Sequence, residues 1–384
     1  MMAGFLLARA GVDVVVLEKH ADFFRDFRGD TVHPSTLELM AELGLIDKFL
    51  RRPHDEVREL SAQIGQDHLI IADFGRLRTR CRFIALMPQW EFLDFLAEEA
   101  RALPQFSLRM SCEATGLLET GGRVAGVRTT DGDIRADLVI AADGRHSVLR
   151  AAAGLEVDDF GAPMDVLWFR VSRQAGDSSE TFGHAEAGRL MIMLNRTTYW
   201  QCAYVIRKGS AELLRQRPIE NFRRDVLAMA PMLADRLVEL GSWDDVKLLT
   251  VAVDRLKRWS RPGLLAIGDA AHAMSPVGGV GINLAIQDAV AAANRLAAPL
   301  RAGTLAAADL EAVQRRREFP VRVVQDAQIA IQRMVIDRLL VANRPLRAPW
   351  LLRTLAAIPP LRAIPAYLVG VGIRPEHIAV TGSG

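Results

Sequence analysis

GLLAIGDAAHAMSPVGGVGIN, residues 263–283, is the most informative stretch of the sequence. Its apolar beginning predicts a short buried strand that ends at Gly268, where the missing side chain lets a ligand approach the backbone. Asp269 follows and offers a carboxylate that accepts hydrogen bonds from sugar-like hydroxyls. The glycines after Pro276 can expose backbone N–H groups at the start of a helix expected near Asn283, where negative charge is favoured. The order of strand, acid and glycine-rich helix start indicates a ligand site rather than a plain turn.

A second segment, residues 136–150, leads another strand into the turn Asp143-Gly144. The carboxyl ends of strands are where ligands collect in open α/β sheets, and Ser147 and Arg150 lie one helical turn apart just beyond. Asp-Gly after a strand is common in ordinary turns. The segment therefore indicates a ligand site only in combination with residues 263–283.

The first twenty residues predict a helix at 1–10, a left-handed glycine at Gly11 and a buried parallel strand at 12–17. A signal peptide is the alternative, but no Lys or Arg precedes the apolar run, which continues directly into a strand. Glu18 ends this strand, where an acid of a βαβ unit typically binds ribose hydroxyls, and Arg28 beyond it can reach a phosphate.

The remaining pattern predicts one nucleotide-binding domain interrupted by a β-rich insertion, without internal repeats. We expect a helix at 34–52, two strands around Gly75 within 57–86, a helix at 89–103, hairpin turns at 120–122 and 130–132, an antiparallel meander at 164–206, and long helices at 284–340 with a kink at Pro320.

Composition narrows the class of partner. The 384 residues carry a net charge of +2 and 6% aromatic residues, which does not favour a nucleic-acid surface. Three widely spaced cysteines argue against a metal cluster or disulfide framework and favour a reducing, cytoplasmic setting. The most apolar run, 354–373, is cut by an arginine and three prolines, so a transmembrane span is not expected. Residues 350–373 could still contact a membrane surface, with docking onto the protein's own core as the default expectation.

Together, Gly268-Asp269 with the glycines that follow, and Asp143-Gly144 with Ser147 and Arg150, resemble the motifs of the FAD-dependent class A aromatic hydroxylases of the para-hydroxybenzoate hydroxylase fold. The resemblance implies that Asp269 holds the ribityl chain of FAD and Glu18 the adenosine ribose. It places Asp143 near both FAD and the incoming nicotinamide nucleotide, and the glycine segment beside the isoalloxazine. The implied cofactor-binding residues are Glu18, Lys19, Arg28, Gln89, Asp143, Gly268, Asp269, Pro276, Gly278, Gly279, Gly281 and Asn283.

The resemblance also implies a reaction and a domain plan. NAD(P)H would reduce FAD, which would then use dioxygen to transfer one oxygen atom to a phenol-like or larger aromatic molecule. The expected fold is an α/β, Rossmann-like FAD-binding domain whose first strand is absent, with an inserted antiparallel substrate domain and a helical C-terminus. The expected domains are 1–154 and 256–300 for FAD binding, 155–255 for the substrate, and 301–384 for the C-terminal helices.

One departure concerns the start of the chain. The family begins with a strand and a G-x-G-x-x-G loop that cradles the FAD pyrophosphate, and here Gly4 is the only glycine before Gly11. Either the sequence starts at an internal Met of a longer product or the chain lacks a central strand. The first explanation is favoured, because losing a central strand exposes unpaired backbone groups and part of the core.

Several alternatives remain open at the level of sequence. A flavin halogenase is disfavoured because no two tryptophans fall two apart, as a W-x-W-x-I-P segment requires, but another flavin oxidase or reductase is possible. A non-catalytic remnant is the alternative from another class. No catalytic acid or base is assigned, because His33, His184 and His272 each suit a packed or capping role. Pocket residues are expected among the aromatic and methionine residues of the insertion, about half of which would belong to its core: Trp168, Phe169, Met191, Met193, Trp200 and Tyr204.

Overall fold

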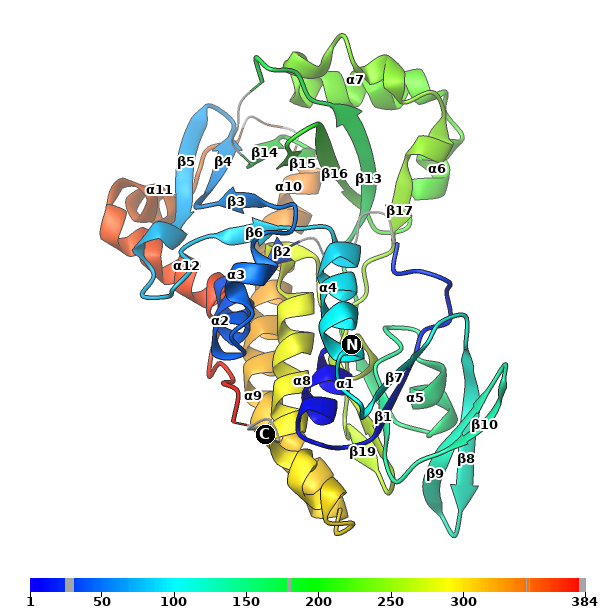
Figure 1. The fold of residues 1–384 in the computed structure, drawn as a ribbon. Coiled ribbons are helices and arrows are strands. Elements are labelled where there is room, and N and C mark those ends of the chain that lie inside the picture. The colour runs from blue at the N-terminus through cyan, green and yellow to red at the C-terminus, as the bar shows by residue number, and fades with distance from the viewer. Residues whose placement is uncertain (25–30, 178–180, 343, 345, 380–384) are drawn as a thin grey trace.

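The computed structural model describes residues 1–24, 31–177, 181–342, 344 and 346–379. A β-rich part (green) lies at the top of Figure 1, and below it the N-terminal segment (blue) lies beside two long helices (yellow to orange). The lower part combines small sheets and helices from distant parts of the chain. This mixed α/β architecture with a helical C-terminus confirms the predicted fold class.

The N-terminal segment has the predicted elements, but its strand is more exposed than predicted. Helix α1 (Met2–Arg9) is followed by Gly11, whose φ is +81°, and by strand β1 (Val14–Leu17). β1 pairs in parallel with β7 (Phe106–Arg109). The prediction of a buried strand is wrong, since Val15 is 43% exposed where β1 borders a cavity.

The two motif-bearing turns are neighbours because their strands pair. β11 (Val139–Ala141) runs parallel to β20 (Leu264–Ala266), and β20 also pairs with β19 (Ser260–Arg261). The N–H of Ile267 donates to the carbonyl of Ala141 at 3.0 Å, so both turns leave the sheet at the same end. Helix α5 (Val148–Ala152) follows the first turn, and α8 (Gly281–Arg301) follows the second.

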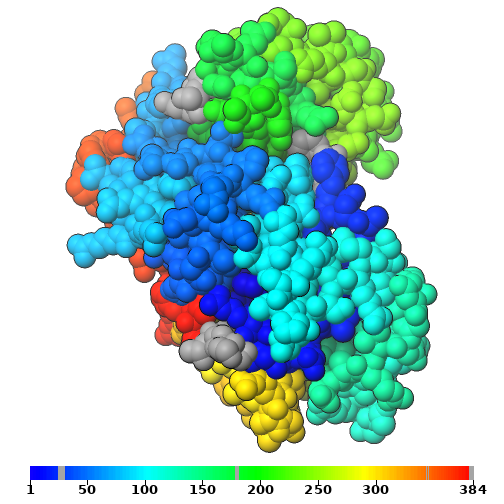
Figure 2. All heavy atoms as spheres, in the orientation of Figure 1, coloured from blue at the N-terminus to red at the C-terminus, as the bar shows by residue number. Residues whose placement is uncertain are grey.

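A small antiparallel sheet and one helix confirm the sequence pattern. β8 (Ala114–Thr120), β9 (Arg123–Thr129) and β10 (Gly132–Arg135) form the expected hairpins, and α4 (Gln89–Arg101) packs against α1. In the space-filling view α4 (cyan) and the blue residues that precede it in the chain cover the middle of the front face, between the green β-rich part at the top and the yellow helical end at the bottom (Figure 2).

The helix predicted at 34–52 is divided. α2 (Pro34–Glu42) and α3 (Ile46–Phe49) are separated at Gly44, whose φ of +75° is incompatible with a continuing helix. A three-stranded sheet lies next to them and consists of β2 (Thr31–Val32), β6 (Ile84–Leu86) and β3 (Asp55–Val57).

The turn between the next two strands lies at Gly65 rather than at Gly75. Strands β4 (Glu59–Ile64) and β5 (Asp67–Asp73) turn where Gly65 has a φ of +56°, whereas Gly75 lies in a short 3₁₀ turn, η1 (Phe74–Arg76). The presence of a glycine in the sequence did not show which of these two positions forms the turn between the strands.

The β-rich part is one seven-stranded sheet, and the predicted antiparallel meander forms its centre. Residues before the insertion extend it, because β4 pairs in parallel with β14. In spatial order its strands are β17 (Lys247–Leu249), β13 (Met164–Ser172), β16 (Tyr199–Arg207), β15 (Arg189–Arg196), β14 (Phe182–Glu186), β4 and β5.

The two faces of this sheet have different roles. One face packs against α7 (Ile219–Met229) and the smaller α6 (Ala211–Arg215), and the other faces the lower part of the molecule. Five of the six candidate pocket residues belong to the packed face, and only Trp168 lines the cavity. Side chains alternate along a strand, so the cavity side carries the residues between them. Short elements complete this region: β12 (Val157–Asp159), β18 (Asp254–Leu256), η2 (Pro231–Leu233), η3 (Leu237–Glu239) and η4 (Trp243–Asp245).

The C-terminal part is helical. α9 (Ala307–Ile331) packs along α8 and continues through Pro320 as one helix, and α10 (Asp337–Val341) follows after a π-turn, η7 (Gln332–Ile336). Three shorter elements, α11 (Trp350–Ala357), η8 (Pro359–Arg362) and α12 (Ala363–Gly370), pack on β5 and leave Trp350 and Leu351 exposed. None of the helices within the described residues has the length and apolar character to cross a membrane.

Candidate active site

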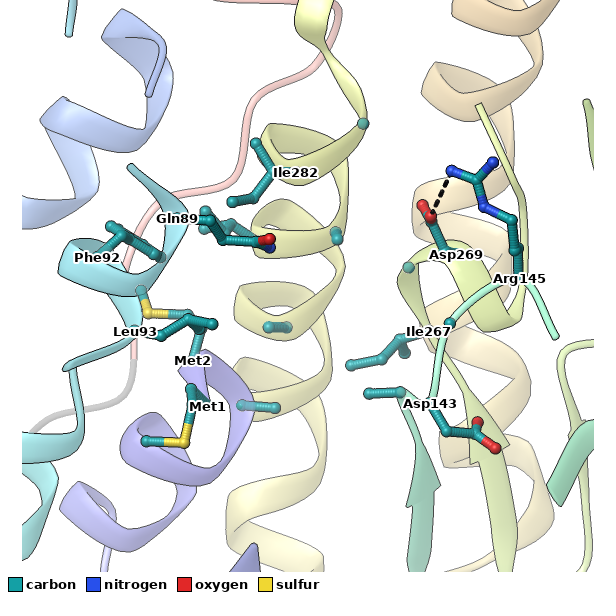
Figure 3. A pocket seen from close by; sticks show the side chains of 18 of the residues that line it. Met1, Met2, Gln89, Phe92, Leu93, Asp143, Arg145, Ile267, Asp269 and Ile282 are labelled. Carbon is teal, nitrogen blue, oxygen red and sulfur yellow. Dashed lines mark ion pairs between the residues drawn. The ribbon is translucent and has the colours of Figure 1, made fainter. Parts of the chain in front are cut away.

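A cavity of 2410 Å³ joins the two motif turns to the β-rich part. Figure 3 shows two walls, with Gln89, Phe92 and Met1 on one side and Asp143 and Asp269 on the other, and α8 between them. The predicted residues Glu18, Lys19, Gln89, Asp143, Gly268, Asp269, Pro276, Gly278, Gly279 and Gly281 all line this cavity.

Gly268 is required by the geometry of its turn. Its φ is +58°, and a Cβ added there would lie 2.9 Å from the Cβ of Ala285 on α8. The turn is therefore seated directly on α8, and a carboxylate of α8, Asp288, accepts the Gly268 N–H at 3.0 Å. Asp269 then projects into the cavity, where its Oδ2 lies 3.8 Å from Nη2 of Arg145 (Figure 3).

The Asp143 carboxylate organises the neighbouring turn. Ser147 Oγ donates to its Oδ1 at 2.5 Å, and the N–H of Leu149 donates to its Oδ2 at 3.2 Å. Arg150 donates to the carbonyl of Arg145 at 2.6 Å, so it holds the loop that carries the cation facing Asp269. The predicted motif thus acts as a unit that fixes one edge of the cavity.

The glycine segment is pressed against the beginning of β2. Gly279 has a φ of +62°, and a Cβ there would lie 2.5 Å from Oγ1 of Thr31, which donates to the Gly279 carbonyl at 2.9 Å. Asn283 is buried and does not line the cavity; its Nδ2 donates to the carbonyl of Thr31 at 2.9 Å, and its Oδ1 accepts the N–H of His33. Its predicted contact with the cofactor remains a prediction.

The other predicted residues surround the far end of the cavity. Glu18 follows β1 and accepts the N–H of His20 at 3.0 Å, and Lys19 lies 3.9 Å from Glu113 in an exposed ion pair. Gln89 is the first residue of α4. Arg28 lies outside the described residues.

The sheet face above the turns is apolar. Residues that alternate with the packed ones along each strand face the cavity. The period of two in the sequence is the signal that separates these two sets of residues. They include Trp168, Leu190, Ile192, Leu194 and Val205.

The three histidines are held by contacts within the protein. Nδ1 of His33 donates to the carbonyl of Val369 at 2.8 Å, and burial lowers the pKa of His33 to about 4. Nδ1 of His184 lies 2.6 Å from the carbonyl oxygen of Met229, and Nε2 of His272 lies 2.6 Å from Asp288. None of the three lines the cavity.

The cavity fits the expected FAD in several respects. Two glycines, Gly268 and Gly279, line the cavity without a side chain, so a flat ligand can approach the backbone there. The first turn of α1 also lines the cavity, and the initial N–H groups of a helix lack intrahelical partners, which suits a phosphate. Residues of β1 and β11 line the cavity, and both are edge strands among the described residues.

Comparison with known proteins agrees with this geometry. Residues 1–327 match the family model of the FAD binding domain. The 6-methylpretetramide 4-monooxygenase of Streptomyces rimosus is 33% identical over 367 residues, covering 94% of this chain and 88% of that protein. The rifampicin monooxygenase of Streptomyces venezuelae is 30% identical over 312 residues, covering 78% of this chain and 61% of that protein.

The fold has solved counterparts. A variant of PqsL from P. aeruginosa superposes with a TM-score of 0.75 at 21% identity, covering 88% of this chain and 94% of that one. Family match, relatives and fold therefore agree with the motifs that line the cavity. The chain belongs to the FAD-dependent aromatic monooxygenases of the para-hydroxybenzoate hydroxylase fold.

Proposed function

We propose that the protein uses NAD(P)H and dioxygen to hydroxylate a large, flat aromatic molecule. The observation that carries this proposal is the continuity of one cavity from the Asp143 and Asp269 turns to the apolar face of the seven-stranded sheet. A cofactor at the turns and a substrate on the sheet would then share one space from which bulk water is displaced.

The chain's residues would bind FAD from several sides. Asp269 would accept hydrogen bonds from ribityl hydroxyls, and Glu18 from the adenosine ribose. The N-terminus of α1 would face the phosphates, and Gly278 and Gly279 the flavin ring. Bound FAD supplies electron transfer and activation of dioxygen, which no amino-acid side chain provides.

The substrate class follows from the opposite wall. Trp168, Ile192 and Val205 offer a broad apolar surface on which a fused-ring system can lie. Two relatives are named for large ring-containing compounds, 6-methylpretetramide and rifampicin, which supports a polycyclic rather than a small phenolic substrate.

The domain limits, the compartment and the C-terminal surface are also proposals. We retain 155–255 as the substrate domain, with β4 and β5 completing its sheet. All three cysteines are buried and free, which supports a reducing, cytoplasmic setting. The exposed Trp350 and Leu351 support peripheral membrane contact through 350–373.

Polycyclic and monocyclic phenols would test the proposed substrate class. The FAD-loaded protein is incubated with each compound while NAD(P)H consumption, hydrogen peroxide and hydroxylated product are measured together. We expect polycyclic aromatics to stimulate consumption and yield product in proportion. Peroxide as the sole product for every polycyclic compound would contradict the proposal, since an effector can stimulate NAD(P)H consumption without being hydroxylated.

A further inference from the structure

A buried cluster of charged side chains lies behind the Gly268 turn. Asp288 of α8 is fully buried, and its two oxygens accept from three donors. Oδ2 receives the N–H of Gly268 at 3.0 Å and Nε2 of His272 at 2.6 Å, and Oδ1 receives Nε of Arg317 at 2.9 Å. Burial raises the pKa of Asp288, but His272 and Arg317 outweigh it and leave that pKa below its usual value.

The cluster continues to the C-terminal segment. Nη1 of Arg317 lies 3.5 Å from Oε1 of Glu376, which also receives Nε of Arg316 at 2.6 Å. The same segment is fixed along α8, because Nδ2 of Asn294 donates to the carbonyl of His377 at 2.8 Å. Glu376 is thereby connected through one arginine to the carboxylate that holds the Gly268 turn.

We propose that Asp288 and Glu376 are positioning residues for FAD, a role that rests on the proposed function of the Asp269 turn. Neither residue lines the cavity, so neither contacts the cofactor directly. Asp288 fixes the height of Gly268 on α8, and Gly268 determines where the next residue, Asp269, projects. Glu376 holds Arg317 in place, so the C-terminal segment determines the geometry of the cofactor site from outside it.

The alternative role is purely structural, in which the cluster only fastens α9 to α8. A buried ion pair can serve that purpose, and breaking it destabilises a protein whether or not a ligand is near. The two roles differ in what a substitution changes. A structural role changes the free energy of unfolding, whereas a positioning role also changes FAD affinity and the visible spectrum of the bound flavin.

Two variants and one control separate these roles. Asp288→Asn presents an amide N–H₂ to at least one of three donors, so a repulsive contact forms at Gly268 or at Arg317. Glu376 lies farther from the Gly268 turn than Asp288, and Glu376→Gln removes its charge while keeping its shape. Glu311→Gln on α9 is the matched control, because Glu311 forms an exposed ion pair with Arg315 at 3.4 Å.

The FAD dissociation constant, the flavin visible spectrum and urea unfolding are measured for the full chain and each variant. We expect Asp288→Asn to raise the dissociation constant at least tenfold, about 1.4 kcal/mol, and to shift the flavin spectrum. Glu376→Gln is expected to raise it about threefold with a smaller shift, and Glu311→Gln to change neither quantity.

Loss of stability with unchanged FAD affinity and spectrum in both variants would overturn the positioning role. If Asp288→Asn does not fold, Glu376→Gln decides alone by the same readouts. A wild-type chain that binds no FAD would overturn the proposed function, and the positioning role with it. If the wild-type chain binds FAD tightly and both variants keep its FAD affinity and flavin spectrum, only the positioning role is overturned.

Discussion

Replacing Gly268 with alanine tests whether the turn before Asp269 is as constrained as its geometry indicates. The new Cβ would lie 2.9 Å from Cβ of Ala285, a side chain that cannot rotate away, and the residue would keep a φ of +58°. Gly303 provides the matched control, since its φ is +64° and nothing lies within 4 Å of an added Cβ.

The comparison separates backbone strain from the collision. Left-handed backbone alone is expected to cost about 1 kcal/mol in Gly303→Ala, after allowing for the less flexible unfolded chain. Gly268→Ala adds an overpacked contact against α8, worth about 1 to 3 kcal/mol more. The expected losses in free energy of unfolding are therefore about 1 kcal/mol for the control and about 2 to 4 kcal/mol for Gly268→Ala.

Urea unfolding measures these losses, and flavin absorbance per mole of gel-filtered protein measures FAD retention. We expect Gly268→Ala to retain much less FAD than Gly303→Ala at equal protein concentration, because Asp269 moves with the turn. Equal stability losses in the two variants, with equal FAD retention, would show that the contact between Gly268 and Ala285 does not constrain the turn.

Three further predictions concern other parts of the site. Asp269→Asn should weaken FAD binding about tenfold, as measured by flavin fluorescence titration. The free energy of urea unfolding of the apoprotein should stay within about 0.5 kcal/mol of the wild-type value. Unchanged FAD affinity would remove Asp269 from the cofactor site. Ile192→Trp should fill the sheet side of the cavity, abolishing aromatic stimulation of NAD(P)H consumption while flavin absorbance is retained; persistent stimulation would place the substrate elsewhere. Because the pKa of His33 falls to about 4 in the folded protein from 6.5, stability is fully present above pH 6.5 and decreases as the pH falls towards 4. Between pH 7.5 and 5 this decrease amounts to about 2 kcal/mol, and His33→Gln, which can still donate to Val369, should show a correspondingly flatter profile; an unaltered profile would exclude His33 as its cause.

The sequence was most informative where one residue type has one physical reason. Gly11 was predicted correctly, because a helix end of this kind needs glycine and the structure gives it a positive φ angle. The strand predicted to end at Gly268 ends two residues earlier, at Ala266. The turns that carry Asp143 and Asp269 leave the sheet at the same end, because parallel strands deliver their ends to one edge of a sheet. In these cases a short stretch of sequence was enough to predict the local backbone conformation and the end of the sheet at which a turn lies.

The sequence was less informative where distant contacts decide. The cavity side of the sheet depends on where α7 packs, and the alternation of Met191 with Ile192 does not say which face is covered. The pairing of β4 with β14 joins residues far apart in the chain, which no local pattern reveals. The connection of Asp288 to Glu376 through Arg317 is likewise invisible until α8 and α9 are packed.

The most direct test of the central claim is the origin of the oxygen atom in the product. The FAD-loaded protein, NAD(P)H and a polycyclic phenol that stimulates NAD(P)H consumption are incubated under isotopically heavy dioxygen, and the product is analysed by mass spectrometry. We expect a product that carries one heavy oxygen atom from dioxygen. Unlabelled product, or a chain that retains no flavin when supplied with FAD, would contradict the central claim.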